Sequence, residues 1–262
     1  SKVVIGLVDN SSYTDVRDLP AIYAISPDWT NRTLERVNGV GGEMMLDFDF
    51  TTASTYKLYI HAYLNDGELA ILGDCVIGVD EWGDLEAGGY TFNRETYDAR
   101  FEAYEIDFTS ISKNNLAYVP AESPSNLRNM TGMFAGTDLG YPEVDLSGYD
   151  VGSVYSMAGV FAHSNFNGNI LSWNMRWVGI LDYAFYASKF RQDLSLWCVA
   201  NIGSEPKLFS HRAPLLAKYK PVWGTCPLED NTSQVTLRNS AGYGVELSKA
   251  SISNDYSRDN PA

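Results

Sequence analysis

The chain has 262 residues and a formal net charge of −14, with 19 basic residues against 33 acidic ones. Hydrophobic residues make up 45% of it and aromatic residues 13%, which is enough to bury a core and argues against a wholly disordered chain. An acidic surface repels phosphate backbones, so nucleic acid is not an expected partner, and no apolar run approaches the roughly 20 residues that span a bilayer. No secretory signal precedes the first apolar stretch, which favours a chain made in the cytosol or already processed.

Residues 1–72 show the alternation that is typical of β-strands. In the segment MMLDFDF, apolar residues alternate with Asp47 and Asp49, and a second alternating run, YKLYIHAYL, covers residues 56–64. The expected structure is therefore a pair of half-buried antiparallel strands in a small sheet or sandwich. Asp47 and Asp49 would share one face of a strand, where calcium could bind, but a solvated face is the commoner origin of such alternation.

The sequence then repeats. The segments DLSGYDV, NILSWNM and DLSLWCV recur every 24 residues and place Tyr149, Trp173 and Trp197 at equivalent positions. A phenylalanine closes the segments NMTGMF, SMAGVF and LDYAF that precede them. A period in the twenties is typical of leucine-rich-repeat solenoids, in which each unit is a short strand plus a helical turn or short helix. We therefore predict a right-handed solenoid, with a short strand around Trp197 and a helical turn around Met130.

A unit this small cannot close a core of its own, so each unit should stack its aromatic residues onto the next. Loss of one buried phenylalanine should then cost about 3–5 kcal/mol. The predicted repeat core consists of the recurring apolar residues, which are Met130, Met133, Phe134, Leu146, Tyr149, Met157, Phe161, Phe166, Ile170, Trp173, Phe185, Phe190, Leu194 and Trp197.

The same segments carry a family resemblance. NMTGMF, FNGNILSW, FRQDLSLWCV and the final block WCVANIGSEPKLFS…KPVWGTCP resemble the BspA-like surface-protein repeat. This is a leucine-rich-repeat-like family found in bacterial surface proteins and in some bacteriophage proteins. The resemblance covers roughly residues 73–227, with Tyr149 standing where the pattern has tryptophan. It implies adhesion or display without an agreed chemistry, so the ligand-binding residues stay unknown.

Two of the three cysteines, Cys198 and Cys226, lie in the final block of this resemblance. A disulfide between them would join the last repeat to its cap, with Cα atoms roughly 4.4–6.8 Å apart and a stabilisation on the order of 3 kcal/mol. All three cysteines, Cys75 included, fit equally well as small buried hydrophobic residues. The sequence leaves both alternatives open.

No constellation of catalytic or metal-ligating residues is recognisable. The histidines His61, His163 and His211 are scattered without metal-ligand spacing, and there is no P-loop, G-x-S-x-G or HExxH motif. We therefore predict no catalytic residues, no metal site, no cofactor and no enzymatic activity.

The composition turns polar after Pro227, and residues 228–262 are expected to form an extended arm with short strands. The predicted fold class is α+β. It comprises an N-terminal β-rich attachment domain (1–72), a short leucine-rich-repeat-like β/α solenoid with a C-terminal cap (73–227), and the arm (228–262).

Two functions fit this organisation. In the first, the chain is a bacteriophage virion-surface structural protein, a capsid decoration or a tail or fibre component. The N-terminal domain and the arm would bind other virion structural proteins in an oligomeric assembly, while the repeat adheres to a host-surface protein or glycan. In the second, it is a secreted or cell-surface bacterial adhesin that uses the same repeat. The lack of a leader and of an anchor motif, together with the few repeats, favours the virion surface over the bacterial surface.

Overall fold

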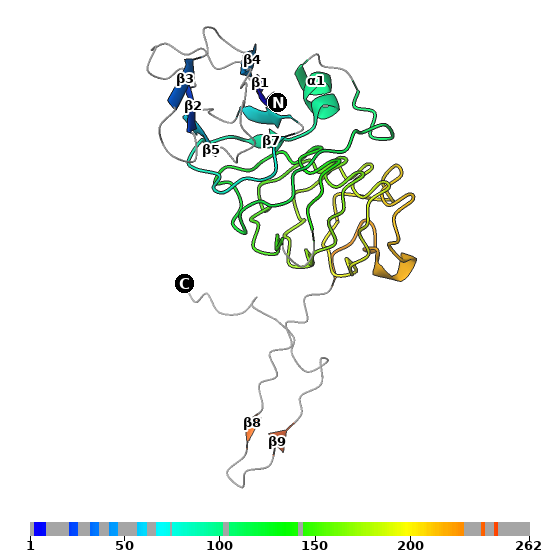
Figure 1. Cartoon of the computed structure of the whole chain (residues 1–262). Coiled ribbons are helices and arrows are strands. Elements are labelled where there is room, and N and C mark those ends of the chain that lie inside the picture. Colours follow the sequence, from blue (N-terminus) through cyan, green and yellow to red (C-terminus); the bar gives the residue numbers. More distant parts are fainter. Residues whose placement is uncertain are drawn as a thin grey trace, which may run out of the picture. The chain divides into compact units, whose positions relative to one another are not determined.

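The structure is a computed structural model of the chain (Figure 1), and residues 1–227 form one compact unit while residues 228–262 form a second. The described residues are 3–8, 21–25, 32–36, 42–46, 57–61, 67–73, 75–101, 105–140, 144–227, 237–238 and 244–245. Asp47, Asp49 and most of the expected arm lie outside them.

A four-stranded sheet in the order β4-β1-β6-β7 begins the first unit. Strand β1 (Val3–Val8) pairs antiparallel with both β4 (Gly42–Leu46) and β6 (Glu68–Leu72). Strand β7 (Gly89–Thr91) pairs with β6 in parallel, and all three of its residues are buried. Because β6 and β7 are hydrogen-bonded neighbours, the domain boundary expected after residue 72 falls inside this sheet.

A second sheet has three antiparallel strands in the order β3-β2-β5. They are β2 (Ala21–Ile25), β3 (Arg32–Arg36) and β5 (Lys57–His61). The run YKLYIHAYL contains β5, whereas MMLDFDF contributes only its first three residues to β4 within the described part of the chain. Each of these two strands has an antiparallel neighbour, β1 for β4 and β2 for β5, but they lie in different sheets and do not form the expected pair with each other.

One α-helix follows, α1 (Arg94–Phe101). Asn93 precedes it, and its side-chain oxygen accepts the amide of Thr96 at 3.3 Å, as expected of an N-cap residue. The Asn93 side-chain amide donates in turn to the Ser112 carbonyl at 2.9 Å. This asparagine therefore fixes the start of α1 and also ties the helix to the chain that leads into the repeat.

The parallel pairing of β7 continues into the repeat through single residues. Gly89 bridges to Asn129, Asn129 to Ser156, and Ser156 to Ile180, each pair in parallel. In Figure 1 the corresponding segments, green to yellow, lie as successive turns beside one another. The first unit is thus continuous from its sheet into a stack of turns, and we call this part of the chain, residues 105–227, the turn stack.

Backbone hydrogen bonds hold the turns together by an alternating pattern. The amides of Gly132 and Phe134 donate to the next turn, to the carbonyls of Ala158 at 2.8 Å and Val160 at 2.9 Å. The amide of Met133, between them, donates within its own turn to Met130 at 3.0 Å. The same alternation recurs in the two following turns, so the buried backbone groups of these segments find partners without forming regular strands.

Some of the residues that donate to the next turn take the left-handed conformation. Gly136, His163 and Ala187 occupy equivalent positions of successive turns and have φ values of +70°, +58° and +51°. We call these three residues the left-handed column. Glycine suits this conformation, whereas a residue with a Cβ pays roughly 1–2 kcal/mol to adopt it. The two later turns therefore tolerate strain that the first turn avoids.

The local structure differs from the expected strand and helical turn. Around Trp197 the chain forms a turn at Ser195 and Leu196 rather than a strand, and Leu196 is exposed. Around Met130 the hydrogen bonds run from i to i−3, as Met133 to Met130, so the segment is a turn and not α-helical. In both places the backbone bonds outward to neighbouring turns compete with regular local structure.

The stack ends in a cap that includes a short 3-10 helix, Ala217–Tyr219. Leu194 donates its amide to the Tyr219 carbonyl at 2.8 Å, and Val199 donates to Thr225 at 2.9 Å. The second unit contains the antiparallel pair β8 (Leu237–Arg238) and β9 (Gly244–Val245).

Candidate functional site

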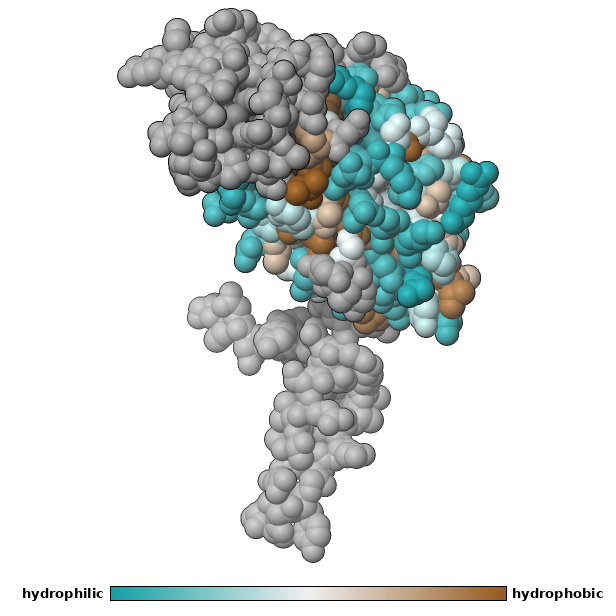
Figure 2. Space-filling model, in the orientation of Figure 1, coloured by the Kyte–Doolittle hydropathy of each residue, from teal (hydrophilic) through white to brown (hydrophobic). Residues whose placement is uncertain are grey.

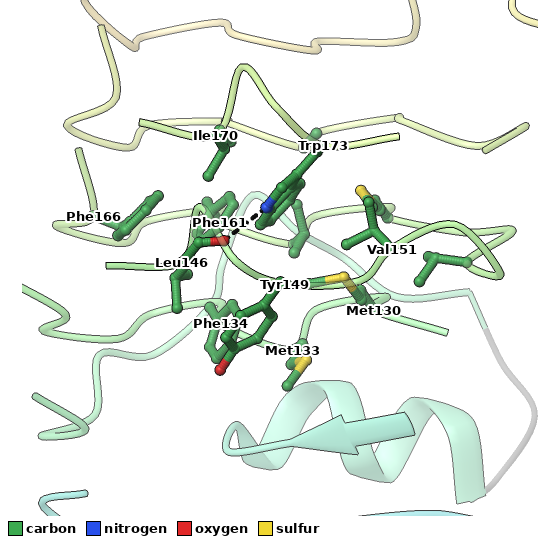
Figure 3. Close-up of a cluster of buried hydrophobic side chains, with 14 of the residues drawn as sticks. Met130, Met133, Phe134, Leu146, Tyr149, Val151, Phe161, Phe166, Ile170 and Trp173 are labelled. Atoms are coloured by element: carbon green, nitrogen blue, oxygen red, sulfur yellow. Dashed lines mark hydrogen bonds between the residues drawn. The ribbon is translucent and has the colours of Figure 1, made fainter. Parts of the chain in front are cut away.

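The core of the turn stack contains every residue of the predicted repeat core. All fourteen are buried, with exposed fractions between 0% and 4%. Figure 3 shows several of them, including Phe134, Phe161 and Trp173, pointing into one cluster from successive turns. These side chains form the interior that supports the surface and are themselves inaccessible to a ligand.

The aromatic rings of the core form a column. Phe161 stacks between Phe134 and Phe185, with ring centroids 5.6 Å and 5.7 Å away. Offset stacking of this kind adds about 0.5–1.5 kcal/mol per pair beyond the burial of apolar area. The column thus fixes the spacing of the turns and, with it, the positions of the exposed side chains.

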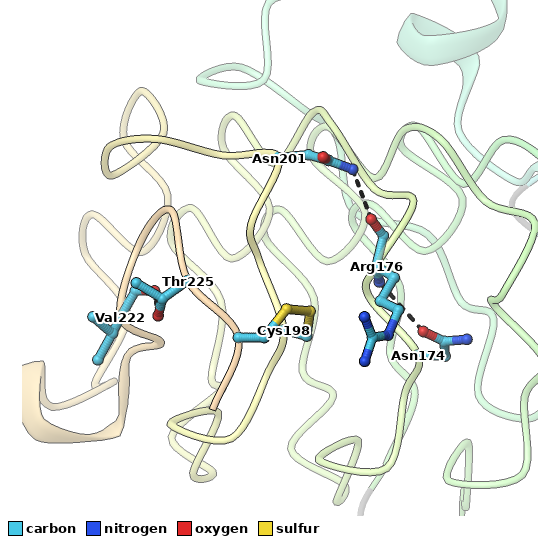
Figure 4. The surroundings of a disulfide bond; sticks show 7 residues. Asn174, Arg176, Cys198, Asn201, Val222 and Thr225 are labelled. Atoms are coloured by element: carbon cyan, nitrogen blue, oxygen red, sulfur yellow. Dashed lines mark hydrogen bonds between the residues drawn. A yellow bond between two sulfur atoms is a disulfide. The ribbon is translucent and has the colours of Figure 1, made fainter. Parts of the chain in front are cut away.

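Cys198 and Cys226 form a disulfide that joins the last turns to the cap (Figure 4). Their Cα atoms are 3.9 Å apart, closer than the range given above, and 28 residues separate them in sequence. Cys75 is partly buried against the main core and takes no part in this bond. The two alternatives were a Cys198–Cys226 disulfide and three cysteines that are all small buried residues. The structure contains the disulfide, and Cys75 is half-buried.

Two of the scattered histidines lie close together beside the left-handed column. His163 lies edge-on to the Tyr186 ring at a centroid distance of 5.4 Å, and His211 stacks on the same ring at 5.9 Å. The backbone ladder explains this, because His163 bonds to Tyr186 and Ala187 bonds to His211 in the next turn. Spacing in the sequence hid this proximity, since the three residues belong to different turns.

Basic groups extend this cluster. The Arg212 guanidinium lies 5.9 Å from the Tyr186 ring centroid, and Lys207 Nζ lies 5.1 Å from that of Tyr183. The hydrogen bond between Lys207 and Tyr183 raises the pKa of Lys207 above its ordinary value. We call His163, Tyr183, Tyr186, Lys207, His211 and Arg212 the aromatic–basic strip. Cation–π contacts at exposed sites are worth about 0.5–1 kcal/mol, which favours these positions of the side chains without fixing them.

Another face of the stack presents a row of exposed turn tips. Tyr155 donates its amide to Arg128, and Gly179 donates to Tyr155, both at 2.9 Å, so these residues are in register across three turns. Two positions before Arg128, Tyr155 and Gly179, the chain reaches the tip of each turn. We call these three tip residues, together with the residue 24 positions after the last of them, the turn-tip row. Its members are Asn126, Ser153, Trp177 and Asn201.

Among the large hydrophobic residues that the structure describes, Trp177 is the most exposed, at 70%, and Tyr155 is 53% exposed. Both lie in this part of the surface, whereas Trp173 and Trp197 are buried. Figure 2 shows that one face of the first unit is mostly hydrophilic, with hydrophobic residues interspersed. A single exposed ring is common, but two exposed aromatic residues on neighbouring turns form a small contiguous area, which makes this part of the surface a candidate for an interaction.

A shallow hollow of about 240 Å³ opens at the start of the turn-tip row. Its walls come from the segment 123–127 and from Asp150 and Ser153 of the next turn. Ser123 Oγ accepts the amide of Asp150 at 3.1 Å, which fastens the two turns together at this point. The hollow is therefore part of the stacked framework, and four of its seven lining residues are serine or asparagine.

Sequence reasoning overlooked Trp177, Tyr155 and this hollow. The 24-residue spacing could have predicted the exposure of Trp177, because it aligns Trp177 with Ser153 at the tip of a turn. Trp173 and Trp197, which are buried, align with each other at a different position. His61 lies in β5, and its side chain is outside the described residues. Within the described ranges, no group of three or more His, Cys, Asp and Glu side chains is placed to hold a metal ion, and no helix has the length and apolarity to cross a bilayer.

Comparison with known proteins finds one family. The model of the family described as "Mycoplasma protein of unknown function, DUF285" matches residues 106–220, less than half of the chain. The matched part lies within the turn stack and is consistent with a BspA-like repeat. No curated protein and no solved structure matches the chain.

Proposed function

We propose that the protein is a non-enzymatic recognition protein displayed outside a particle or cell, and that residues 73–227 are a short leucine-rich-repeat-like solenoid. The interturn ladder and the stacked phenylalanines support the solenoid, since each turn closes its core only against its neighbours. Two surfaces are available on this framework for binding: the turn-tip row, and the exposed Lys207, His211 and Arg212 of the aromatic–basic strip, which lie over Tyr183 and the buried Tyr186.

The Cys198–Cys226 disulfide carries the proposal of an exterior location. Disulfides persist in oxidising surroundings, such as the extracellular space and the surfaces of virions and cells, and are rare in the reducing cytosol. The match to a family with the BspA-like repeat points the same way, because the resemblance implies adhesion or display.

Two settings fit an exterior location. One is the surface of a bacteriophage virion, where residues 1–72 and the arm would bind other virion proteins and many copies would give avidity for a host surface. The family match, whose description names a cellular bacterium, favours the surface of a bacterial cell. In either setting the acidic chain, with its net charge of −14, is a poor partner for nucleic acid.

Immunogold labelling of the source culture tests this proposal, with antibodies raised against the folded protein. We expect labelling of intact virions or of unpermeabilised cells, and the particle that is labelled decides between the two settings. Labelling that requires permeabilised cells would place the protein in the cytosol and overturn the proposal.

Removal of residues 228–262 tests the assignment of attachment. If the arm holds the chain in its assembly, the truncated protein should fold, because residues 1–227 form a compact unit, and should fail to incorporate. Normal incorporation of the truncated chain would show that another surface makes the attachment.

A further inference from the structure

We infer that the hollow beside the turn-tip row binds one pyranose ring of a carbohydrate, with Trp177 as the stacking platform. This inference names a ligand class for the displayed surface and so rests on the proposed function. Its binding test is independent of where the protein is located.

The register of the turns brings Trp177 next to the hollow. The amide of Val154 bonds to Val151, and that of Val178 bonds to Met175, so these two turns have the same conformation 24 residues apart. Ser153 and Trp177 therefore occupy the same position of adjacent turns, which lie about 4.8 Å apart, the spacing of hydrogen-bonded neighbours. Ser153 lines the hollow, so Trp177 lies one turn beyond a lining residue and on the same row of turn tips.

The exposed ring supplies a flat apolar face. Trp177 is 70% exposed. Gly179, two positions later in the same turn, has open space where a side chain would stand. A planar ligand face can therefore approach the indole without obstruction from that residue. Tyr155, 53% exposed on the preceding turn, offers a second aromatic surface beside it. Sugar rings, whose two faces carry C–H groups, are matched by surfaces of this kind.

The hollow supplies hydrogen-bonding groups for hydroxyls. The carboxylate of Asp150 accepts the amide of Gly152 with Oδ1 at 2.9 Å, and no residue in the described ranges bonds to its Oδ2. The hydroxyls of Ser125 and Ser153 likewise have no partner among the described residues. Carboxylate and hydroxyl groups held on a fixed backbone can accept from and donate to neighbouring sugar hydroxyls.

The size and chemistry of the hollow favour a sugar over other ligands. Its volume of about 240 Å³ is below the roughly 300–1,000 Å³ of pockets for drug-sized molecules, so it takes a single ring. Because Asp150 lies in its wall, an isolated phosphate would meet a like charge there. An apolar peptide anchor would leave the serine and aspartate groups without partners, which is unfavourable.

The experiment is a glycan array of neutral and acidic oligosaccharides, probed with the full chain and followed by calorimetric titration with the oligosaccharides that bind. Wild type and four variants are compared. Trp177→Ala removes the platform, Asp150→Asn changes the polar wall, and Ser153→Arg fills the hollow. Val222→Ala is the matched control, since Val222 is 67% exposed in the cap, away from the hollow.

We expect wild type and Val222→Ala to bind the same oligosaccharides. Trp177→Ala should weaken binding by about tenfold or more, as the loss of a central aromatic anchor does, and Ser153→Arg should abolish it. Circular dichroism should show the same fold for all variants, because the substituted residues are exposed or line the hollow. Absence of binding across the array, or binding that Trp177→Ala and Ser153→Arg leave intact, would overturn the inference while leaving the exterior location untouched.

Discussion

Trp173 and Trp197 lie parallel in adjacent turns, with ring planes 5° apart and centroids 6.4 Å apart. Each indole Nε1–H donates to a carbonyl 27 residues earlier, Trp173 to Leu146 at 2.8 Å and Trp197 to Ile170 at 3.0 Å. One side chain thus fills the core and at the same time satisfies a buried backbone acceptor of the preceding turn. Both functions of the residue can be separated by substitution.

Trp173→Phe keeps an aromatic ring and removes the donor. The Leu146 carbonyl then keeps only the Tyr149 amide, at 3.1 Å, and we expect the free energy of unfolding to fall by about 0.5–1.5 kcal/mol, the net contribution of one hydrogen bond. Urea denaturation measures this loss. Trp177→Phe is the matched control because Trp177 is 70% exposed, and its effect should stay within about 0.5 kcal/mol. Equal effects of the two substitutions would contradict the structural role given to Trp173.

The left-handed column predicts opposite outcomes at two of its positions. In Gly136→Ala the new Cβ would lie 2.1 Å from the Ser112 carbonyl oxygen at a φ of +70°, so we expect a loss of at least about 1–2 kcal/mol. In Ala187→Gly the strain at +51° is relieved, and we expect a gain of up to about 1 kcal/mol. Thermal unfolding followed by circular dichroism compares the two.

Gly179→Ala serves as the control for that pair, because nothing lies within 4 Å of the added carbon. Its melting temperature should match that of the wild type. A gain for Gly136→Ala, or a loss for Ala187→Gly, would show that the left-handed conformation is not what governs these positions.

Removal of the disulfide should destabilise the cap. The Cys198→Ser/Cys226→Ser double variant loses a cross-link over 28 residues, and loop-closure entropy predicts a cost of about 3–4 kcal/mol. Peptide mapping without reductant should recover the Cys198–Cys226 pair from the wild type, and urea denaturation with and without reductant measures its contribution. Cys75→Ser, which keeps the bond, should not respond to reductant differently from the wild type.

Two aspartates give the turn stack an acid-sensitive component. The amide of Ser147 holds the pKa of Asp145 below 3.8, and the amide of Ser195 does the same for Asp193. Because the folded pKa is below the unfolded one, this stability is present above about pH 4 and is lost as the pH falls through the folded pKa values. Both side chains are exposed, so the effect should be modest.

Asn169 occupies the equivalent position of the middle turn and accepts the amide of Leu171 with its uncharged side chain at 3.0 Å. The Asp145→Asn/Asp193→Asn variant should therefore keep both turns and lose less stability between pH 5 and pH 2 than the wild type, by urea denaturation at each pH. A slope as steep as that of the wild type would show that these hydrogen bonds do not contribute to acid unfolding.

The repeat could be located from the sequence because its aromatic residues recur at a constant spacing. Phe161 and Trp173 are buried where that spacing predicts. The backbone between them could not be predicted in this way, since the ladder alternates bonds between turns with bonds within a turn and uses left-handed residues such as His163. Propensity rules assign that conformation to glycine, and the turn stack uses it for histidine and alanine as well.

Surface features were harder to predict than the core. The exposed Trp177 and the buried Trp173 are the same residue type four positions apart, and only their places in the turn separate them. The meeting of His163 and His211 at Tyr186 depends on two inter-turn hydrogen bonds and leaves no mark in the local sequence. The exposed residues of both candidate surfaces are therefore set by register, which a search for local motifs does not detect.

The cap has a consequence for how the protein behaves in a crowded solution. Every turn of the ladder presents its backbone donors and acceptors to the next turn, so an uncovered final turn would be a template for any extended segment that reached it. Tyr219 and Thr225 occupy the acceptor positions opposite Leu194 and Val199, and the disulfide pins that covering segment in place. At Leu194 and Val199 the covering segment therefore takes the place that an extended segment of another chain could otherwise occupy.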